Sequence, residues 1–566
     1  MTAEAVKQKR RSGSKEEKQK PSGPSREAAK KKVDMIRGGL DPDARDERGQ
    51  LRSLKGFQIS RRASEEIIKD LQTRGKFFRE GELGYYLDLQ TRKLIDIGQS
   101  ALDLGDLLSK YGLNPTEKVF KYVVAEMFLH AINKGEQTHV HHFAHLNFAE
   151  DDEPVLYIAC DSNHVLRINA DLYEVTDNGI DGVLFLTSEY TAPLDIPAEF
   201  VAARGLLKSL LLGRIPFDTD VLTREESELL LLAEMLALLM REAIPDTRPI
   251  FAFIGEKGSG KTTAVRMVGR TLYGPSWDVT DITSNVRDFD TLISTDDFVC
   301  FDNVDENIKW LNNKLAVAAS GAKVSRNKLY ETHCLLQYPI ISMVATTSRT
   351  PCFRRDDVAD RLVILRTVRL DRSDQVEFNP DVEQGILMKR RELWGELIFR
   401  IQQVLHLMRD TDWQSIRVKG KRLQGFARLT ILLAKILGCE KTASQAWEKM
   451  GSAQRQFAAE GEPLFDAMPE WVAANTGREV TAGELNAELK PIELGRVIEW
   501  PYANGRSLGQ KLSQLRESLS EMFDVSEREC PSRKQRVYRF WPKGHGPESD
   551  SDDEGFRSDS ANDSGA

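Results

Sequence analysis

The chain has 566 residues, with 79 Lys and Arg against 87 Asp and Glu and a formal net charge of −8. At about 150 residues per domain, this length predicts three or four domains. The six cysteines form no C-x-x-C pair, which argues against a disulfide scaffold or a zinc ribbon and indicates a reducing compartment. No apolar run is long enough to cross a bilayer. We therefore expect a cytoplasmic protein with no membrane segment.

Charge is concentrated at the two ends of the chain. Residues 1–32 hold eleven Lys and Arg against four Glu, and residues 543–566 hold two Lys and Arg against seven Asp and Glu. Polar segments of this kind bury too little apolar surface to offset the entropy of ordering. We expect a disordered basic arm over 1–56 and a disordered acidic tail over 544–566. The basic arm can bind nucleic acid weakly or serve only to keep the chain soluble.

Composition and periodicity divide the rest of the chain into successive regions. Short strands around a helix at Glu117–Lys134 predict an α+β accessory domain, and short apolar runs alternating with helical stretches predict a parallel sheet. A buried helix is expected after the capping box Thr223–Glu226. The expected boundaries are 57–190 for the α+β domain, 191–247 for a helical linker, 248–372 for the sheet domain, 373–470 for a helical domain and 471–543 for a C-terminal domain.

The clearest motif is Gly255-Glu256-Lys257-Gly258-Ser259-Gly260-Lys261-Thr262-Thr263, a complete G-x-x-x-x-G-K-T. It follows the apolar strand Ile250–Ile254 and precedes a helical stretch, the context that this motif requires. Glycines allow backbone N–H groups to wrap around phosphates. Lys261 would place its charge on the β- and γ-phosphate oxygens, and Thr262 would bind Mg²⁺. The sequence predicts that these nine residues bind ATP with Mg²⁺.

A second apolar strand ends in Asp302. At the carboxyl edge of a parallel sheet, this carboxylate would lie beside the phosphates and hold the Mg²⁺ shell together with Thr262. The next residue is Asn303, where many such ATPases have a Glu that orients the attacking water. The general base is therefore left open among Asn303, Asp305 and Glu306.

A basic stretch follows, with Lys323, Arg326, Lys328 and Tyr330. The last three lie two residues apart and would share one face of a strand, whereas Lys323 could join them only near a turn. Basic side chains bind a phosphate backbone without reading bases, and Tyr330 could stack on a base. The alternative is a solvated run of charges.

In these motifs, residues 250–370 resemble the superfamily-three helicases of the AAA+ class, which are found in phage, plasmid and viral replication proteins. The flanking regions are similar in layout to phage primase–helicase proteins. The resemblance implies a multidomain α/β fold, with a P-loop AAA+ ATPase core, an α+β N-terminal domain, helical flanking segments and a C-terminal winged helix. It also implies that residues 321–330 form a hairpin that points into a central channel holding a single DNA strand.

The resemblance further implies roles at a subunit interface. Thr346 or Thr347 occupies the sensor position, where relatives usually have Asn, and a Thr hydroxyl reaches less far. Arg361 matches the region that supplies an arginine finger to the neighbouring subunit, with Arg354 and Arg355 as the alternative finger. A finger acting in trans implies a homo-oligomeric ring, commonly a hexamer. The alternative for Arg361 is a surface salt bridge to a nearby Asp.

Near the C-terminus, an amphipathic helix over residues 508–523 precedes a basic segment and an aromatic strand. This pattern looks like a winged helix, which can bind duplex DNA or a protein. The DNA-binding candidates here are Lys511, Arg516, Arg533, Lys534 and Arg536. A separate cluster, His139, His141, His142 and His145, is interpreted as a polar strand edge, because no Cys or carboxylate completes a tetrahedral metal site.

These observations predict a Mg²⁺-dependent ATPase, and most directly a ring-forming DNA helicase in replication of a phage, plasmid or integrated element. Two alternatives are carried forward. One is an ATP-switched replication initiator or loader that binds DNA without unwinding it. The other is a regulatory or defence NTPase that acts on protein partners.

Overall fold

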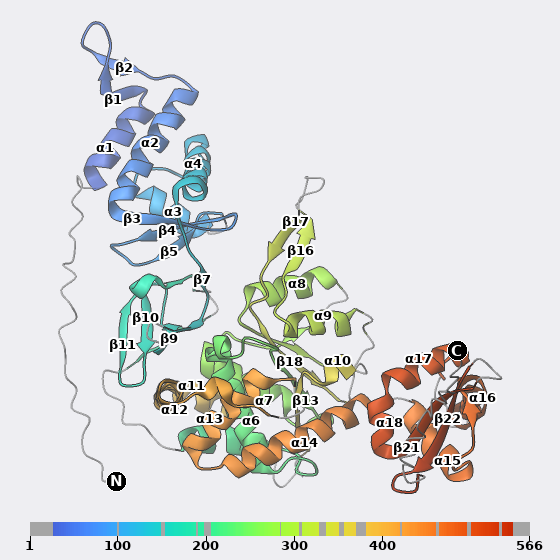
Figure 1. Ribbon diagram of the computed structural model, residues 1–566. Helices are drawn as coiled ribbons and strands as arrows, with labels where there is room; N and C mark the ends of the chain where they lie inside the picture. Colours follow the sequence, from blue (N-terminus) through green and yellow to red (C-terminus); the bar gives the residue numbers. More distant parts are fainter. Residues whose placement is uncertain are drawn as a thin grey trace, which may run out of the picture.

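The structure is a computed structural model that describes residues 26–98, 101–148, 153–187, 191–196, 205–282, 285–304, 308, 310–327, 335–349, 356–369, 381–418, 422–459, 463–494, 500–530 and 535–546. The fold is of the mixed α/β type. Figure 1 shows an elongated N-terminal part, a central α/β body and a smaller C-terminal part. Within the described ranges, no helix combines the length and the apolar character needed to cross a bilayer.

The N-terminal part begins with a helix where the sequence predicted disorder. Helix α1 (Arg26–Arg37) buries Ala29, Val33 and Ile36, which repeat every three or four residues and so lie on one face. This face packs against α2 (Phe57–Arg74), and the hairpin β1 (Leu40–Arg45)–β2 (Leu51–Ser53) connects the two helices. The expected disorder is therefore wrong for residues 26–56, because the many Lys and Arg residues masked a short apolar stripe. Residues 1–25 and the acidic tail after 546 lie outside the described residues.

Two antiparallel-rich sheets complete the N-terminal part. The first has the order β5-β4-β3-β6 and is covered by α3 and α4, and the second has the order β11-β10-β9-β8. Helix α4 confirms the helix expected over Glu117–Lys134. The bounds are β3 (Gly75–Glu80), β4 (Leu83–Asp88), β5 (Leu94–Asp96), α3 (Ala101–Ser109), α4 (Lys118–Lys134), β6 (Glu136–Gln137), β7 (Val140–His141), β8 (Ala144–Phe148), β9 (Pro154–Ala159), β10 (His164–Ile168), β11 (Tyr173–Asp177), η1 (Ile180–Gly182) and β12 (Leu184–Phe185).

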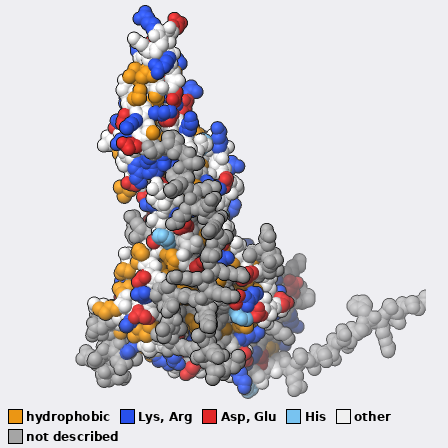
Figure 2. All heavy atoms as spheres, turned by 90° about the vertical axis from the view of Figure 1, so that its left-hand side faces the viewer, with side chains coloured by type: hydrophobic (Ala, Val, Ile, Leu, Met, Phe, Trp, Pro, Cys, Tyr) orange, Lys and Arg blue, Asp and Glu red, His pale blue; other side chains and the backbone are white. Residues whose placement is uncertain are grey.

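Opposite charges are interspersed on the surface of the N-terminal part. Figure 2 shows Lys and Arg side chains next to Asp and Glu side chains on the face that it displays. Arg62 on α2, for example, lies 3.3 Å from Asp41 and 3.5 Å from Glu66. Because basic and acidic side chains alternate on it, this face does not form a uniform basic patch.

A five-stranded parallel sheet forms the centre of the body, with the order β14-β15-β18-β13-β19. The strands are apolar along nearly their whole length because helices cover both faces of the sheet. Strand β18 lies between β13 and β15, so all three strands end side by side at one edge. The bounds are β13 (Ile250–Ile254), α7 (Lys261–Tyr273), β14 (Thr280–Asp281), α8 (Val286–Thr295), β15 (Phe298–Asp302), α9 (Leu311–Ala319), β18 (Met343–Ser348), α10 (Asp356–Ala359) and β19 (Leu362–Arg366).

The helical regions on either side of the sheet belong to the same body. One continuous hydrophobic core runs from Phe143 to Ala453. It includes the parallel sheet, the helices before and after it in the sequence, and one face of the sheet formed by β8, β9 and β10. The segments expected as separate helical domains, 191–247 and 373–470, share this core with the sheet. The capping box at Thr223 is confirmed. The bounds are α5 (Leu206–Leu210), η2 (Leu212–Arg214), α6 (Arg224–Leu239), η3 (Arg241–Ala243), α11 (Asp381–Met388), α12 (Arg390–Asp410), η5 (Trp413–Ser415), α13 (Gln424–Leu437) and α14 (Glu440–Ala459).

An antiparallel hairpin, β16 (Val324–Asn327) and β17 (Leu335–Tyr338), leaves the body after α9. Figure 1 shows it projecting away from the sheet, next to α8. The hairpin returns to the body just before β18, the central strand of the sheet.

The C-terminal part has its own hydrophobic core, which runs from Leu464 to Phe540. This core begins at α15, earlier than the expected boundary at 471. The helix expected over 508–523 is broken at Leu515, which ends α17 and precedes α18. A three-stranded antiparallel sheet has the order β20-β22-β21. The bounds are α15 (Pro463–Ala474), β20 (Val480–Thr481), α16 (Ala482–Leu494), α17 (Gly505–Gln514), α18 (Arg516–Met522), β21 (Phe523–Cys530) and β22 (Gln535–Pro542).

Candidate functional site

The loop Gly255–Gly260 joins β13 to α7, and its glycines are required by its geometry. Gly258 and Gly260 have φ angles of 84° and 81°, in the left-handed region that favours glycine. A Cβ atom on Gly255 would lie 2.4 Å from the Thr367 carbonyl oxygen and 2.5 Å from the Ser259 hydroxyl. The loop is therefore a tight cradle of backbone that larger side chains would fill.

Lys261, Ser259 and Thr367 hold this loop together. Lys261 opens α7 with only 6% of its surface exposed, and its Nζ donates to the Glu256 carbonyl at 3.3 Å. The buried Ser259 hydroxyl lies 2.8 Å from Thr367 Oγ1, and the Thr367 N–H donates to the Ile254 carbonyl at 2.8 Å. The end of β19 thus fixes the start of the loop. Of the other motif residues, Glu256 and Lys257 are exposed and Thr262 and Thr263 are half-buried.

Three strand and helix ends meet at the carboxylate of Asp302. The Thr262 hydroxyl donates to Asp302 Oδ1 at 2.9 Å, and the Thr347 hydroxyl donates to the same oxygen. Thr347 Oγ1 also accepts the Asn303 N–H at 3.0 Å. These contacts follow from the strand order, because β18 carries Thr347 between the loop after β13 and Asp302 at the end of β15.

Thr346 and Thr347 point to opposite faces of the sheet, as neighbours on a strand must. Thr347 faces Asp302, as described above. Thr346 is fully buried, and its hydroxyl has no hydrogen-bond partner among the described residues. Of the two sensor candidates, only Thr347 is brought to the site.

The residue after Asp302 adopts an unusual backbone conformation. Asn303 has a φ angle of 53°, which is uncommon for a residue other than glycine. Its side chain is exposed, and Nδ2 lies 3.4 Å from Asp302 Oδ2. The other two candidates for the general base, Asp305 and Glu306, lie outside the described residues.

Arg361 does not lie where an arginine finger would need to be. Only 7% of its surface is exposed, and its guanidinium donates to the Ala316 carbonyl of α9 in the same chain. A finger in trans must project from the surface toward a neighbouring subunit, so this placement contradicts the expectation for Arg361. The alternative finger residues, Arg354 and Arg355, lie outside the described residues.

Two residues near the loop were missed in the sequence. Thr367 holds the loop as described above, and Arg369 follows it. A Cβ atom on Gly258 would lie 3.9 Å from Arg369 Nε, so this guanidinium lies against the exposed part of the loop. The sequence contained a signal for both residues. They follow β19, a fourth apolar strand, and the end of a parallel strand lies at the same edge of the sheet as the loop.

Arg248 connects the hairpin to the strand that carries the loop. Its N–H donates to the Ala319 carbonyl at 2.8 Å, and its Nη1 donates to the Ile340 carbonyl at 2.8 Å. Burial lowers the pKa of Arg248 to about 10, which leaves it protonated at neutral pH. Ala319 and Ile340 lie just before and just after the hairpin, and Arg248 lies two residues before β13. Lys323 is exposed at the base of the hairpin and Arg326 lies on β16, whereas Lys328 and Tyr330 are outside the described residues.

The C-terminal candidates are only partly brought together. The Arg516 side chain is 70% exposed and lies 3.9 Å from Glu527, and the Arg536 side chain is 57% exposed and pairs with the same carboxylate at 2.8 Å. Lys511 lies on α17 and is half-buried. Arg533 and Lys534 are outside the described residues.

Three of the clustered histidines form a stack. The rings of His141 and His145 are 3.7 Å apart and nearly parallel, and His139 packs edge-on against His141 at 4.7 Å. Burial, together with the charge of His145, lowers the pKa of His141 to about 2. His145 Nδ1 lies 3.2 Å from a Glu242 carboxylate oxygen. The stack therefore joins β7 and β8 to η3 through a neutral ring rather than lining an open strand edge.

Neither the family models nor the curated proteins gave a match to this chain. Among solved structures, it is similar to the active helicase Cch of SCCmec type IV, at 12% identity over 82% of this chain and 92% of that chain, with a TM-score of 0.42. It is also similar to the apo C-terminal region of NrS-1, at 13% identity over 84% and 98% of the two chains and a TM-score of 0.37. A JCV helicase matches at 13% identity over 44% and 61%, with a TM-score of 0.22. Similarities at this level do not establish a family.

Proposed function

We propose that this protein is an ATP-dependent DNA helicase, a ring-forming AAA+ motor in the replication of a phage, plasmid or integrated element. The observation that carries the proposal is the linkage of Thr262, Asp302 and Thr347 beside a glycine loop that ends in Lys261. This arrangement combines a backbone cradle, a buried lysine and a carboxylate, which are the parts of a P-loop nucleotide site.

The residues of the site fit ATP and Mg²⁺. The left-handed glycines leave the backbone open to phosphates, and Lys261 at the start of α7 supplies a positive charge where the helix N-terminus also favours anions. Thr262 and Asp302 provide the oxygen ligands that Mg²⁺ prefers. Bound Mg²⁺ would neutralise phosphate charge. Arg369 would add a second positive charge from the same chain.

The contacts within the site suggest how its residues act. The Thr262 hydroxyl can donate its hydrogen bond to Asp302 while its oxygen binds the metal ion. Thr347 would hold the same carboxylate in place, so that a movement of Asp302 would also move β18. The exposed Asn303 side chain would orient the attacking water, with Asp305 and Glu306 as the alternatives. Arg354 and Arg355 take the place of Arg361 as the proposed finger residues at the interface of a hexameric ring.

The hairpin would couple the nucleotide site to DNA. Arg248 ties both ends of the hairpin to the residues that precede β13, so a shift of the loop after β13 can be passed to the hairpin. Lys323, Arg326, Lys328 and Tyr330 would contact the backbone of one strand in the channel.

The C-terminal part would act as a winged helix. Its elements follow the order helix, strand, helix, helix and two-stranded wing, given by α15, β20, α16, α17 with α18, and β21 with β22. This order is typical of winged helices, which bind duplex DNA or proteins.

Strand displacement on a forked DNA, with ATP hydrolysis followed in the same tubes, tests the proposal. Lys261→Ala should abolish both activities, because the phosphates lose their lysine. The triple variant Lys323→Ala/Arg326→Ala/Lys328→Ala should keep basal hydrolysis and lose stimulation by DNA. Hydrolysis stimulated by DNA without displacement would favour the initiator or loader, and hydrolysis indifferent to DNA would favour the regulatory or defence NTPase. Hydrolysis retained by Lys261→Ala would refute the site itself.

A further inference from the structure

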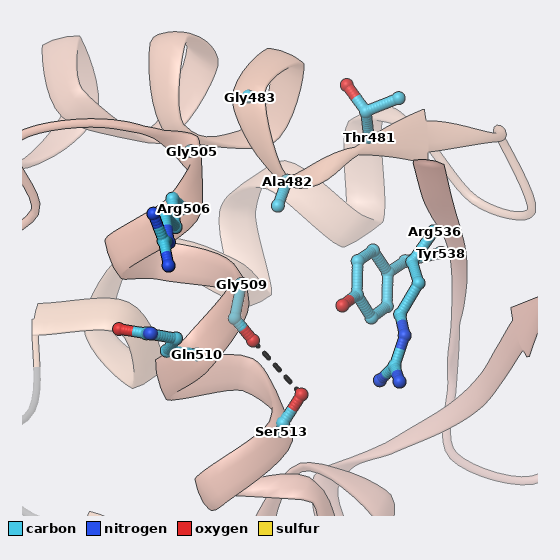
Figure 3. A pocket seen from close by; sticks show the side chains of 10 residues that line it. All are labelled: Thr481, Ala482, Gly483, Gly505, Arg506, Gly509, Gln510, Ser513, Arg536 and Tyr538. Atoms are coloured by element: carbon cyan, nitrogen blue, oxygen red, sulfur yellow. Dashed lines mark hydrogen bonds between the residues drawn. The ribbon is translucent and has the colours of Figure 1, made fainter. Parts of the chain in front are cut away.

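A pocket of about 480 Å³ opens in the C-terminal part, between the starts of α16 and α17 and the strand β22. Figure 3 shows that side chains from all three elements line it. The lining residues that matter below are Gly483, Arg506, Gly509, Gln510, Ser513 and Arg536.

The floor of the pocket is largely backbone. A Cβ atom on Gly505 would lie 2.5 Å from the Gly483 Cα, and one on Gly509 would lie 3.3 Å from the Ala482 Cβ. The two helices therefore touch through glycine, and no long side chain rises between them. A ligand can approach the backbone here, as it does at other glycine-lined sites.

Polar and positively charged side chains stand on two walls of the pocket, and Ala482 and Tyr538 are also part of its lining. Arg506, Gln510 and Ser513 lie along one face of α17, spaced by three or four residues, and Arg536 approaches from β22 (Figure 3). The lining contains two arginines and no acidic residue. Arg506 is exposed, and among the described residues it forms no ion pair, whereas Arg536 keeps 57% of its side chain exposed while it pairs with Glu527.

We propose that this pocket seats a phosphodiester group of a nucleic-acid strand. Arg506 and Arg536 neutralise its charge from opposite walls, and the Gln510 amide donates a hydrogen bond, whereas the Ser513 hydroxyl already donates to the Gly509 carbonyl at 3.1 Å. Contacts of this kind bind the backbone without reading bases. A glycine floor lets the sugar and phosphate approach closely. The site rests on the proposed function in acting on DNA, and it gives the C-terminal part a role in holding the strand.

Of the candidates that the sequence indicated in this part, Arg536 lines the pocket, and Lys511 and Arg516 do not. Lys511 lies one residue after Gln510 and so points to another side of α17, and Arg516 belongs to α18. The surface proposed here instead combines the start of α17 with the wing strand β22.

Fluorescence anisotropy of the full-length chain, with a labelled single strand and a labelled duplex over a range of salt, tests the assignment. The variant Arg506→Gln/Arg536→Gln should bind about tenfold more weakly at low salt, because it removes charge-assisted hydrogen bonds to the phosphate. For each phosphate that the variant no longer neutralises, the slope of log affinity against log salt should fall by about 0.7 for a single strand or 0.9 for a duplex. Gln510→Glu, at an exposed position, should also weaken binding because it adds a negative charge to the pocket.

The matched control, Arg478→Gln/Arg528→Gln, removes two exposed arginines of the same part outside the pocket and should change both quantities much less. An effect confined to the single strand or to the duplex identifies the source of the phosphodiester. Unchanged binding of Arg506→Gln/Arg536→Gln, or an equal loss in the control, would overturn the assignment. A wild-type chain that binds neither DNA would instead refute the proposed function, and basal ATP hydrolysis measured on the same samples separates that failure from misfolding.

Discussion

The pair Thr346 and Thr347 allows a sharp test of the nucleotide site, because the two neighbours differ only in the face they occupy. Thr347→Val keeps the shape of the side chain and removes the hydroxyl that donates to Asp302 and accepts the Asn303 N–H. Thr346→Val removes a buried hydroxyl that has no partner among the described residues. Thr347→Val should therefore affect catalysis, whereas Thr346→Val should affect only the free energy of unfolding.

A hydrogen bond to a charged group contributes about 1.5–3 kcal/mol. If the hydroxyl of Thr347 holds Asp302 in the geometry needed for catalysis, Thr347→Val should lower kcat by roughly tenfold to a hundredfold. The loss should be greatest at low Mg²⁺, because Asp302 is a proposed ligand of the metal shell. Thr346→Val should leave kcat unchanged and should maintain or raise the free energy of unfolding, since an unpaired buried hydroxyl costs about 1–3 kcal/mol.

Steady-state hydrolysis at several ATP and Mg²⁺ concentrations, together with urea unfolding, measures both effects. Full activity in Thr347→Val would refute the role of this contact. A similar loss in both variants would show that general disturbance of β18, rather than the bond to Asp302, is responsible.

Two further substitutions test the packing around the site. Gly255→Ala should abolish ATP binding measured by calorimetry, because the added Cβ would lie 2.4 Å from the Thr367 carbonyl oxygen. The control Gly385→Ala in α11, whose added Cβ meets nothing within 4 Å, should leave the free energy of unfolding unchanged or raise it. Normal ATP binding by Gly255→Ala would contradict the tight cradle. Glu234 in α6 is fully buried, its carboxylate has no hydrogen-bond partner among the described residues, and burial raises its pKa well above the ordinary value. Because the folded chain keeps this proton while the unfolded chain releases it above pH of about 4.3, the wild type should lose stability as pH rises from 5 to 8. Glu234→Met should raise the free energy of unfolding, measured with urea, by about 1–3 kcal/mol. The gain should be larger at pH 8 than at pH 5. An equal gain at the two pH values would contradict the raised pKa of Glu234.

The local motifs of the site could be recognised without the fold. The glycine spacing before Lys261, the apolar strand before Asp302 and the capping box at Thr223 each depend on neighbours in sequence. The strand and the capping box are found as expected in the structure. The sequence wrongly predicted disorder over residues 26–56. The apolar stripe of α1 has only three small or branched residues, and the many charges on the opposite face of the helix concealed it.

The relative positions of distant segments required the tertiary structure. Whether Thr346 or Thr347 faces Asp302 depends on the register of β18 between two other strands. The burial of Arg361 depends on α9, and the positions of Thr367 and Arg369 depend on where β19 ends. The pocket between α16, α17 and β22 likewise combines residues that are far apart in the chain. The sequence by itself determined which residues are proposed to bind phosphate and metal, because that chemistry depends on local motifs, whereas strand order and packing decided which of these residues meet.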